Sequence, residues 1–394
     1  MIFCKKCVYP VSAVNLDLDD DEVCSSCRVY EEINEISDKE WKNRENKLVE
    51  LIEENKKKYN PDYDCIIPVG GGKDSYFQTH KIIELGFKPL LVTYYGNNYM
   101  PEGQVNLDRM KECFNCDHLI FYPSVEFLKK INLAAFKIMG DMNWHNHAGI
   151  NIIPSQYAIK FNTNLFIWGE LAWDVSGMFS HKDYMQFNKR MVLEHDMRGF
   201  VREDFYKKEG ITPSELNWCE LPADEEFKNH NLIGLYLGNF LKWDPYKQTD
   251  IIKKKYNWKE ASEEFERTYR KISNLDDMHE NGIHDYLKWI KFGYGRCSDH
   301  ASKDIRMGYL SRSEAIKMVQ KYDHVKPKKD LKRWLEYVKI SEDEFDYIAD
   351  KFRDNKTWFI TDNKWHKKDI NGEIQEYGIC NLNNNDKKKY ERKI

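Results

Sequence analysis

The residues with the clearest chemical pattern are three consecutive glycines followed by Lys73, Asp74 and Ser75, directly after the apolar run of residues 65–69. Such a run is typical of a buried strand, and the residues after Ser75 favour a helix. Glycines allow backbone N–H groups to turn inward, and a helix N-terminus adds partial positive charge. A phosphate-binding turn is therefore predicted, with a plain glycine turn as the alternative. Its members are Gly70, Gly71, Gly72, Lys73, Asp74 and Ser75.

The spacing of this turn excludes a Walker P-loop. A Walker loop has an earlier glycine at a fixed distance before its Gly-Lys pair, and this sequence has none at that position. The turn instead resembles the PP-loop of the ATP-pyrophosphatase enzymes, Ser-Gly-Gly-x-Asp-Ser. Gly70 stands where that family usually has its first serine.

The elements that position this turn alternate between strand and helix. We expect further strands at residues 88–95, 119–122 and 165–168. Strands alternating with helices at this spacing predict an α/β fold with a Rossmann-like parallel sheet that helices cover on both faces. The expected helices are 38–59, 76–85, 101–115, 125–139 and one that ends at 156–161.

The carboxyl ends of parallel strands form one edge of a sheet, where ligands bind. Residues 70–75, 93–98 and 169–174 should therefore converge. Glu170 is the preferred second acid, because a carboxylate after a strand end can hold a metal or accept a proton; a solvated loop glutamate is the alternative. The other candidates are Thr93, Tyr94 and Gly169 for nucleotide and Asn97 and Asp174 for substrate.

Two C-x2-C pairs stand near the N-terminus, sixteen residues apart. This spacing allows two knuckles to close on one Zn²⁺ ion. Four thiolates leave no open coordination position, so we expect a structural zinc site. A redox dithiol is the alternative. The ligands are Cys4, Cys7, Cys24 and Cys27.

Two further groups have more than one interpretation. His145 and His147 form an H-x-H pair without a third ligand nearby, so they are candidates for lining the active site, for a metal or for ordinary hydrogen bonding; His147 is taken as substrate-binding. Cys113 and Cys116 are interpreted as reduced packing cysteines rather than a redox pair.

The chain beyond residue 210 has a helical pattern with several capping boxes, and residues 383–393 are interpreted as a frayed polar tail. A glycine-hinged segment, KFGYGRCSD, interrupts this region. Lys291, Arg296 and Arg306 are the natural clamp for an anionic substrate group, because guanidinium groups bind carboxylate or phosphate in a bidentate way. The alternative is a helix–helix turn with a surface arginine.

The composition of the chain argues against several classes of function. The chain of 394 residues carries 61 Lys and Arg against 65 Asp and Glu, a net charge of −4, which offers no global field for nucleic acid. Neither a signal segment nor a membrane-length apolar run is present, so we expect a cytoplasmic protein without a membrane partner. The ten cysteines then suggest metal binding or reduced thiols rather than disulfides.

Taken together, the chain resembles the N-acetyl sugar amidotransferases, most closely the branch of pseudaminic-acid and related bacterial surface-sugar pathways. The resemblance rests on the four cysteines, the glycine turn, IWGE at 167–170, KFGYGR at 291–296 and DIRMGYLSRSEAI at 304–316. It implies an adenine nucleotide alpha hydrolase-like fold. The expected domains are a Cys4 zinc module (1–45), a PP-loop domain (46–245) and a helical substrate or cap region (246–394).

The resemblance also implies a reaction. ATP would activate the oxygen of an acetamido sugar as an O-adenylyl imidate with release of pyrophosphate, and ammonia would then displace AMP to give an acetamidino sugar. On this scheme the loop N–H groups and Lys73 stabilise the departing pyrophosphate, Asp74 holds Mg²⁺, and Ser75 caps the helix and donates to a phosphate oxygen. Residue 2 is Ile2 rather than a catalytic cysteine, so a separate glutaminase subunit is implied. The sequence leaves open whether the protein forms a homo-oligomer.

Two other functions are weighed against this one. A PP-loop tRNA thiolase would need a persulfide-forming cysteine, for which Cys113 and Cys116 are the paired candidates, and a basic RNA-binding face. A zinc-ribbon interaction protein with a degenerate nucleotide loop would account for Gly70.

Overall fold

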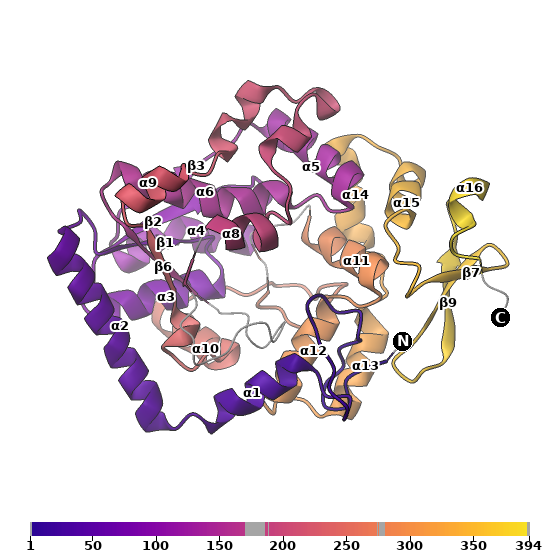
Figure 1. The fold of residues 1–394 in the computed structure, drawn as a ribbon, viewed down its shortest axis with the longest axis horizontal. Coiled ribbons are helices and arrows are strands. Elements are labelled where there is room, and N and C mark those ends of the chain that lie inside the picture. Colours follow the sequence, from indigo (N-terminus) through magenta and orange to yellow (C-terminus); the bar gives the residue numbers. More distant parts are fainter. Residues whose placement is uncertain (1, 170–185, 188, 274, 276–279, 392–394) are drawn as a thin grey trace.

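The computed structural model describes residues 2–169, 186–187, 189–273, 275 and 280–391. Its centre is a six-stranded sheet in the order β3-β2-β1-β4-β6-β5 (Figure 1). Five strands run parallel, and β5 pairs antiparallel with β6, which confirms the predicted parallel α/β sheet. The strands are β1 (Cys65–Pro68), β2 (Pro89–Tyr94), β3 (His118–Phe121), β4 (Leu165–Trp168), β5 (Gln186–Phe187) and β6 (Ile233–Tyr236).

Helices cover both faces of this sheet. Successive residues of a strand point to opposite faces, so neighbouring side chains of one strand enter different apolar clusters. Ile67 of β1 belongs to the apolar cluster that contains Leu107 and Ile252. Its neighbour Ile66 belongs to a cluster on the other face, with Ile153. The helices around the sheet are α2 (Asp38–Tyr59), α3 (Lys73–Glu84), α4 (Pro101–Phe114), α5 (Val125–Met139), α6 (Trp144–Lys160), α9 (Asp224–Asn229) and α10 (Pro245–Tyr256).

The strand order reverses between β1 and β4. The chain first adds β2 and β3 on one side of β1 and then returns to place β4 on the other side, where Ile66 pairs with Phe166. Ligands of open parallel sheets bind beyond the carboxyl ends of the strands at such a reversal. The glycine turn follows β1 directly and lies at this point.

The C-terminal region is helical, as predicted, and also contains a small antiparallel sheet in the order β7-β8-β9 that was not predicted. These strands are short, and their exposed positions gave no clear apolar alternation. The elements are α11 (Asn281–Phe292), α12 (Arg296–Arg306), α13 (Arg312–Tyr322), α14 (Lys328–Val338), α15 (Glu342–Asp350), β7 (Phe359–Thr361), β8 (Lys364–Lys368), β9 (Ile374–Ile379) and α16 (Asn384–Lys387).

The prediction of a frayed tail at 383–393 is wrong for the residues up to 391. Tyr390 is fully buried, its ring packs on Trp365, and its hydroxyl donates to the carbonyl oxygen of Arg353 at 2.8 Å. One buried aromatic residue thus anchors a segment whose composition is otherwise polar.

The N-terminal segment, with α1 (Ser25–Glu35), lies beside α12 and α13 (Figure 1). Tyr9 donates to Asp299 of α12 at 3.0 Å, and Ser12 donates to the carbonyl oxygen of Phe292 at 2.7 Å. The proposed division into three domains stays a prediction; α2 runs through residue 45, and α10 begins at Pro245. Within the described ranges, no helix combines the length and apolarity that crossing a bilayer requires.

Candidate functional site

The glycine turn joins β1 to α3 with its backbone held in place. The Gly70 N–H donates to the Ser75 hydroxyl oxygen at 2.9 Å, and the Trp258 indole N–H donates to the carbonyl oxygen of Gly71 at 3.0 Å. Gly72 precedes the helix without a side-chain cap. The first N–H groups of α3 therefore keep their hydrogen-bonding capacity for a ligand.

Gly71 is required by the shape of the turn. Its φ is +75°, a left-handed conformation, and a Cβ there would lie 2.7 Å from the backbone nitrogen of Leu107. At Gly72, by contrast, no atom of the described residues other than its chain neighbours lies within 4 Å of the place where a Cβ would stand. The space above Gly72 is thus open to a bound group.

Asp74 lies in the first turn of α3 with one oxygen paired and one left over. Its Oδ2 lies 2.6 Å from Lys73 Nζ, whereas Oδ1 is buried without a hydrogen-bond partner in the described part of the chain. The Oε1 of Gln78 is likewise buried without a hydrogen-bond partner among the described residues. Both side chains lie within 4 Å of the place where a Cβ on Gly169 would stand.

Two buried oxygens that need a partner fit a hard cation, because Mg²⁺ prefers oxygen ligands. They also lie where β4 ends beside the start of α3, next to the glycine turn. Asp74 and Gln78 are therefore the candidates for holding a cation such as Mg²⁺ here.

A pocket of about 300 Å³ opens at the carboxyl ends of β1, β2 and β4. Its wall includes Gly70 of the turn, Tyr94 at the end of β2 and Trp168 at the end of β4. This is the convergence that the sequence predicted for the ends of these strands. Its polar part, called here the amide wall, consists of Asn143, Asn146, His147 and Asn281, and apolar side chains such as Val92 and Ile150 line the remainder.

Glu280 is completely buried behind the amide wall and forms hydrogen bonds with it. Its carboxylate accepts from the Nδ2 of Asn146 at 2.9 Å and from the Nδ2 of Asn98 at 2.8 Å, and it lies 3.2 Å from His145 Nε2. The other ring nitrogen of His145 lies 3.0 Å from the Tyr94 hydroxyl. Glu280 thereby fixes groups on two sides of the pocket.

Both histidines of the H-x-H pair are kept neutral. Burial lowers the pKa of His145 to about 3. Burial also lowers the pKa of His147 to about 3, with a further contribution from Arg198 and His284. His147 lines the pocket, whereas His145 lies behind it. The neutral imidazole of His147 offers hydrogen bonds to a ligand without adding charge.

The remaining candidates near the strand ends have different surroundings. Thr93 is fully buried and donates to the carbonyl oxygen of Val69 at 2.6 Å, so it holds the start of the turn and does not line the pocket. Asn97 is exposed in the turn after β2 with φ +63°. Glu170 and Asp174 lie outside the described residues.

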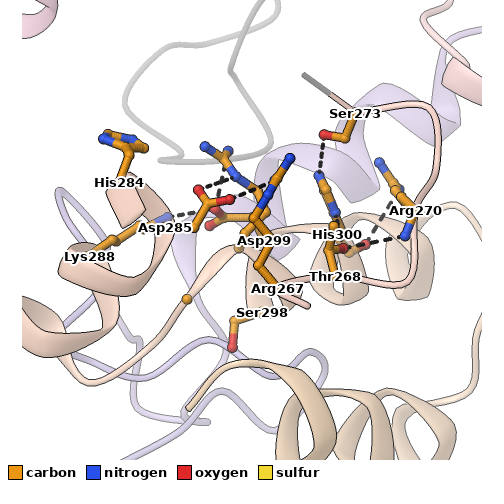
Figure 2. A network of polar contacts seen from close by, with 12 residues as sticks. Arg267, Thr268, Arg270, Ser273, His284, Asp285, Lys288, Ser298, Asp299 and His300 are labelled. Carbon is orange, nitrogen blue, oxygen red and sulfur yellow. Dashed lines mark hydrogen bonds and ion pairs between the residues drawn. The ribbon is translucent and has the colours of Figure 1, made fainter. Parts of the chain in front are cut away.

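The three cations expected to form an anion clamp are not brought together. Lys291 Nζ lies 3.9 Å from Asp141 Oδ2. Arg296 donates from Nε to Asp285 at 2.8 Å, inside a buried network of charges. In Figure 2 this network includes Arg267 on Asp285 and Lys288 on Asp299. Its cations are already paired with carboxylates, so Arg296 supports the packing of α11 and α12.

Arg306 lies against the four cysteines instead of the pocket. The Sγ atoms of Cys4, Cys7, Cys24 and Cys27 all lie within 4.8 Å of one another and are buried. Arg306 Nε is 3.5 Å from Cys27 Sγ, and its Nη2 is 3.8 Å from Cys7 Sγ. Four converging sulfurs fit a tetrahedral Zn²⁺ ion, and the guanidinium offsets the negative charge that such a site carries.

Comparison with known proteins gives one family match, and it covers residues 266–370. The family is described as LPS biosynthesis protein WbpG-like, C-terminal domain. The match supports the surface-polysaccharide part of the resemblance seen in the sequence. A comparison with curated proteins returns no match. The matched segment contains Glu280 and Asn281, so it contributes directly to the wall of the pocket.

Sequence reasoning missed most of this amide wall. Asn143 and Asn146 flank the histidines in the run NWHNH, and that density of hydrogen-bonding side chains was a signal that could have found them. Glu280 and Asn281 had no such signal, because they reach the sheet edge from a segment more than a hundred residues further along the chain.

Proposed function

We propose that this protein is an ATP-dependent amidotransferase that converts the acetamido group of a bacterial surface sugar into an acetamidino group. The observation that carries the proposal is the GGGKDS turn, which opens α3 at the strand-order reversal of a parallel sheet. The family match at residues 266–370, named for LPS biosynthesis, supports a sugar as the second substrate.

The reaction needs two steps, because an amide oxygen is a poor leaving group. The amide oxygen attacks the α-phosphorus of ATP, the bond from that phosphorus to the pyrophosphate oxygen breaks, and an O-adenylyl imidate forms. Ammonia then adds to the imidate carbon, AMP leaves with the former amide oxygen, and loss of a proton gives the neutral amidine. The first step turns the poor leaving group into a phosphate ester, and the second step expels it as AMP.

The chain's own groups have matching roles. The free N–H groups at the start of α3 and the ammonium of Lys73 offset charge on the departing pyrophosphate. Mg²⁺, held by Asp74 and Gln78, would supply further neutralisation of phosphate charge. Because Ser75 already accepts from the Gly70 N–H, its own hydroxyl proton is free to donate to a phosphate oxygen.

The amide wall suits an acetamido group. The Nδ2 of Asn146 already donates to Asn143 and to Glu280, so its Oδ1 can accept from the substrate N–H, whereas the Nδ2 of Asn143 can donate to the substrate carbonyl oxygen. Glu280 keeps Asn146 in one orientation, which reduces the entropy lost on binding. On this proposal Glu170 and Asp174 remain candidates for an acid and a substrate contact.

Ammonia comes from a separate glutaminase subunit on this proposal, and the Cys4 site keeps a structural zinc. The test is to follow nucleotide products with an acetamido sugar, ATP, Mg²⁺ and ammonium. Release of AMP and pyrophosphate only when sugar and ammonia are both present supports the proposal. Formation of ADP, or turnover that requires tRNA, contradicts it.

A further inference from the structure

A second pocket, of about 380 Å³, lies away from the sheet edge and shares no wall residue with the first. Three distant parts of the chain form it: the N-terminal segment at Phe3, the α11–α13 region around Gly293 and Asp323, and the small sheet at Lys367. Nothing in the proposed reaction uses this pocket.

Lys367 is the unusual group in its wall. The side chain is only 5% exposed, and in the part of the chain that the structure describes it makes no ion pair within 4 Å. Its Nζ donates one long hydrogen bond, 3.4 Å, to the carbonyl oxygen of Lys368. A buried ammonium with so few acceptors is costly, and burial lowers the pKa of Lys367 to about 8. The ammonium group of Lys367 therefore can donate further hydrogen bonds to an oxygen atom of a ligand in this pocket.

The carboxylates nearby have their own donors. Asp323 accepts from the N–H of Gly295 at 2.9 Å and from the N–H of Ser298 at 3.1 Å. Asp369 accepts from the N–H of Asn371 at 2.9 Å and from a second backbone N–H. These two acids, with Glu376 on the wall, make the pocket unfavourable for a full anion. The acceptor that fits Lys367 is thus an uncharged oxygen.

Aromatic rings form the other part of the wall. Trp289 and Tyr377 meet edge to face with centroids 5.2 Å apart, and Lys367 Nζ lies 5.2 Å from the centroid of Tyr377. Aromatic faces pack well against the apolar C–H face of a saturated ring. Gln320 and Gln375 add amide donors and acceptors around these rings.

We propose that this pocket binds a neutral pyranose, with a ring oxygen or hydroxyl on Lys367, the C–H face on the aromatic wall and other hydroxyls on the amides and acids. The pyranose is a sugar unit other than the acetamido group that reacts in the first pocket. The second pocket therefore gives the protein a separate carbohydrate-recognition site, and its test does not depend on catalysis.

The experiment is saturation-transfer NMR of methyl α-D-glucopyranoside on the full-length protein. The glycoside should receive saturation from the wild type, and Lys367→Met should weaken its binding by about tenfold, as loss of one charge-assisted hydrogen bond implies. Lys368→Met, at the exposed neighbouring position, is the matched control and should bind as the wild type does. Asp74→Asn should also leave binding unchanged, which separates this site from the proposed reaction.

A thermal unfolding curve of each variant establishes that it is folded. As a second test, Gln320→Ala alters an exposed residue of the pocket wall and should also weaken binding of the glycoside. The proposal is overturned if the glycoside does not bind, if folded Lys367→Met binds it as tightly as the wild type, or if inorganic sulfate occupies the Lys367 site in its place.

Discussion

Gly71 and Gly72 stand side by side in the turn, but only Gly71 has a positive φ and a close backbone neighbour. Gly71→Ala should therefore lower the free energy of unfolding by about 1–3 kcal/mol. Gly72→Ala should change it by less than about 0.5 kcal/mol, because its Cβ would contact nothing in the described part of the chain. Urea denaturation of both variants measures the difference.

The same pair separates folding from ligand binding. If phosphate groups approach the open space above Gly72, Gly72→Ala should bind ATP more weakly while its stability is preserved. Unchanged ATP affinity in Gly72→Ala would show that the nucleotide does not use this turn.

Asp74 gives a second test of the site. Asp74→Asn removes the charge of a carboxylate whose Oδ1 atom is buried and lacks a hydrogen-bond partner among the described residues, so adenylylation should fall by about a hundredfold or more. Zinc content should stay at the wild-type level, because the cysteines are a separate cluster. The exposed Asp62→Asn is the matched control. Turnover of Asp74→Asn at the wild-type rate would remove Asp74 from any metal role.

Strands β1 to β4 and the helices between them could be predicted because each has a local signal, whereas β5 and β6 were not predicted. Apolar runs mark the buried strands, and helix α5 begins and ends where its pattern predicts. Since parallel strands place their carboxyl ends at one edge, the convergence of Gly70, Tyr94 and Gly169 also followed from the sequence.

Contacts between distant segments could not be predicted in this way. Arg296 and Arg306 looked like ligands for an anionic substrate, because guanidinium groups bind carboxylate or phosphate and a glycine precedes Arg296. Their actual partners, Asp285 and the cysteine cluster, depend on how α11, α12 and the N-terminal segment pack. Glu280 was missed for the same reason.

The packing of α12 on the cysteine cluster leads to a prediction about zinc retention. Arg306 contacts the sulfur atoms, whereas Arg312 donates to the carbonyl oxygens of Cys4 and Cys7. Arg306→Gln removes the charge that offsets the thiolates, so a chelator should extract zinc about tenfold faster. Arg312→Gln should release zinc close to the wild-type rate. Equal acceleration in both variants would mean that docking, rather than charge, retains the metal.

The molecule as a whole should lose stability in mild acid. His145 and His147 have pKa values of about 3 in the folded protein, against about 6.5 in an unfolded chain. The unfolded state therefore binds more protons below pH 6.5, and stability falls as pH drops from about 6.5 toward 3. Each histidine contributes up to about 1.4 kcal/mol per pH unit within that range.

Urea denaturation at several pH values checks this dependence. His145→Gln should flatten the slope between pH 6.5 and 4 compared with the exposed control His195→Gln. The carboxylate of Glu280, which lies 3.2 Å from His145 Nε2, remains in both variants. A slope unaffected by His145→Gln would place the acid sensitivity elsewhere.

The parallel sheet and the C-terminal region form one site between them. The sheet supplies the glycine turn and the strand ends, and the family-matched segment supplies Asn281 and the buried Glu280. This shared construction is the reason to expect that a nucleotide and a sugar meet in one pocket.

The most direct test is mass spectrometry of acetamido sugars incubated with the protein, ATP, Mg²⁺ and ammonium. The proposed function predicts a product in which NH has replaced one amide oxygen, with AMP formed in equal amount and ¹⁵N from labelled ammonium in the sugar. An unchanged sugar alongside ATP cleavage, or a sugar that gains a phosphate, would contradict it.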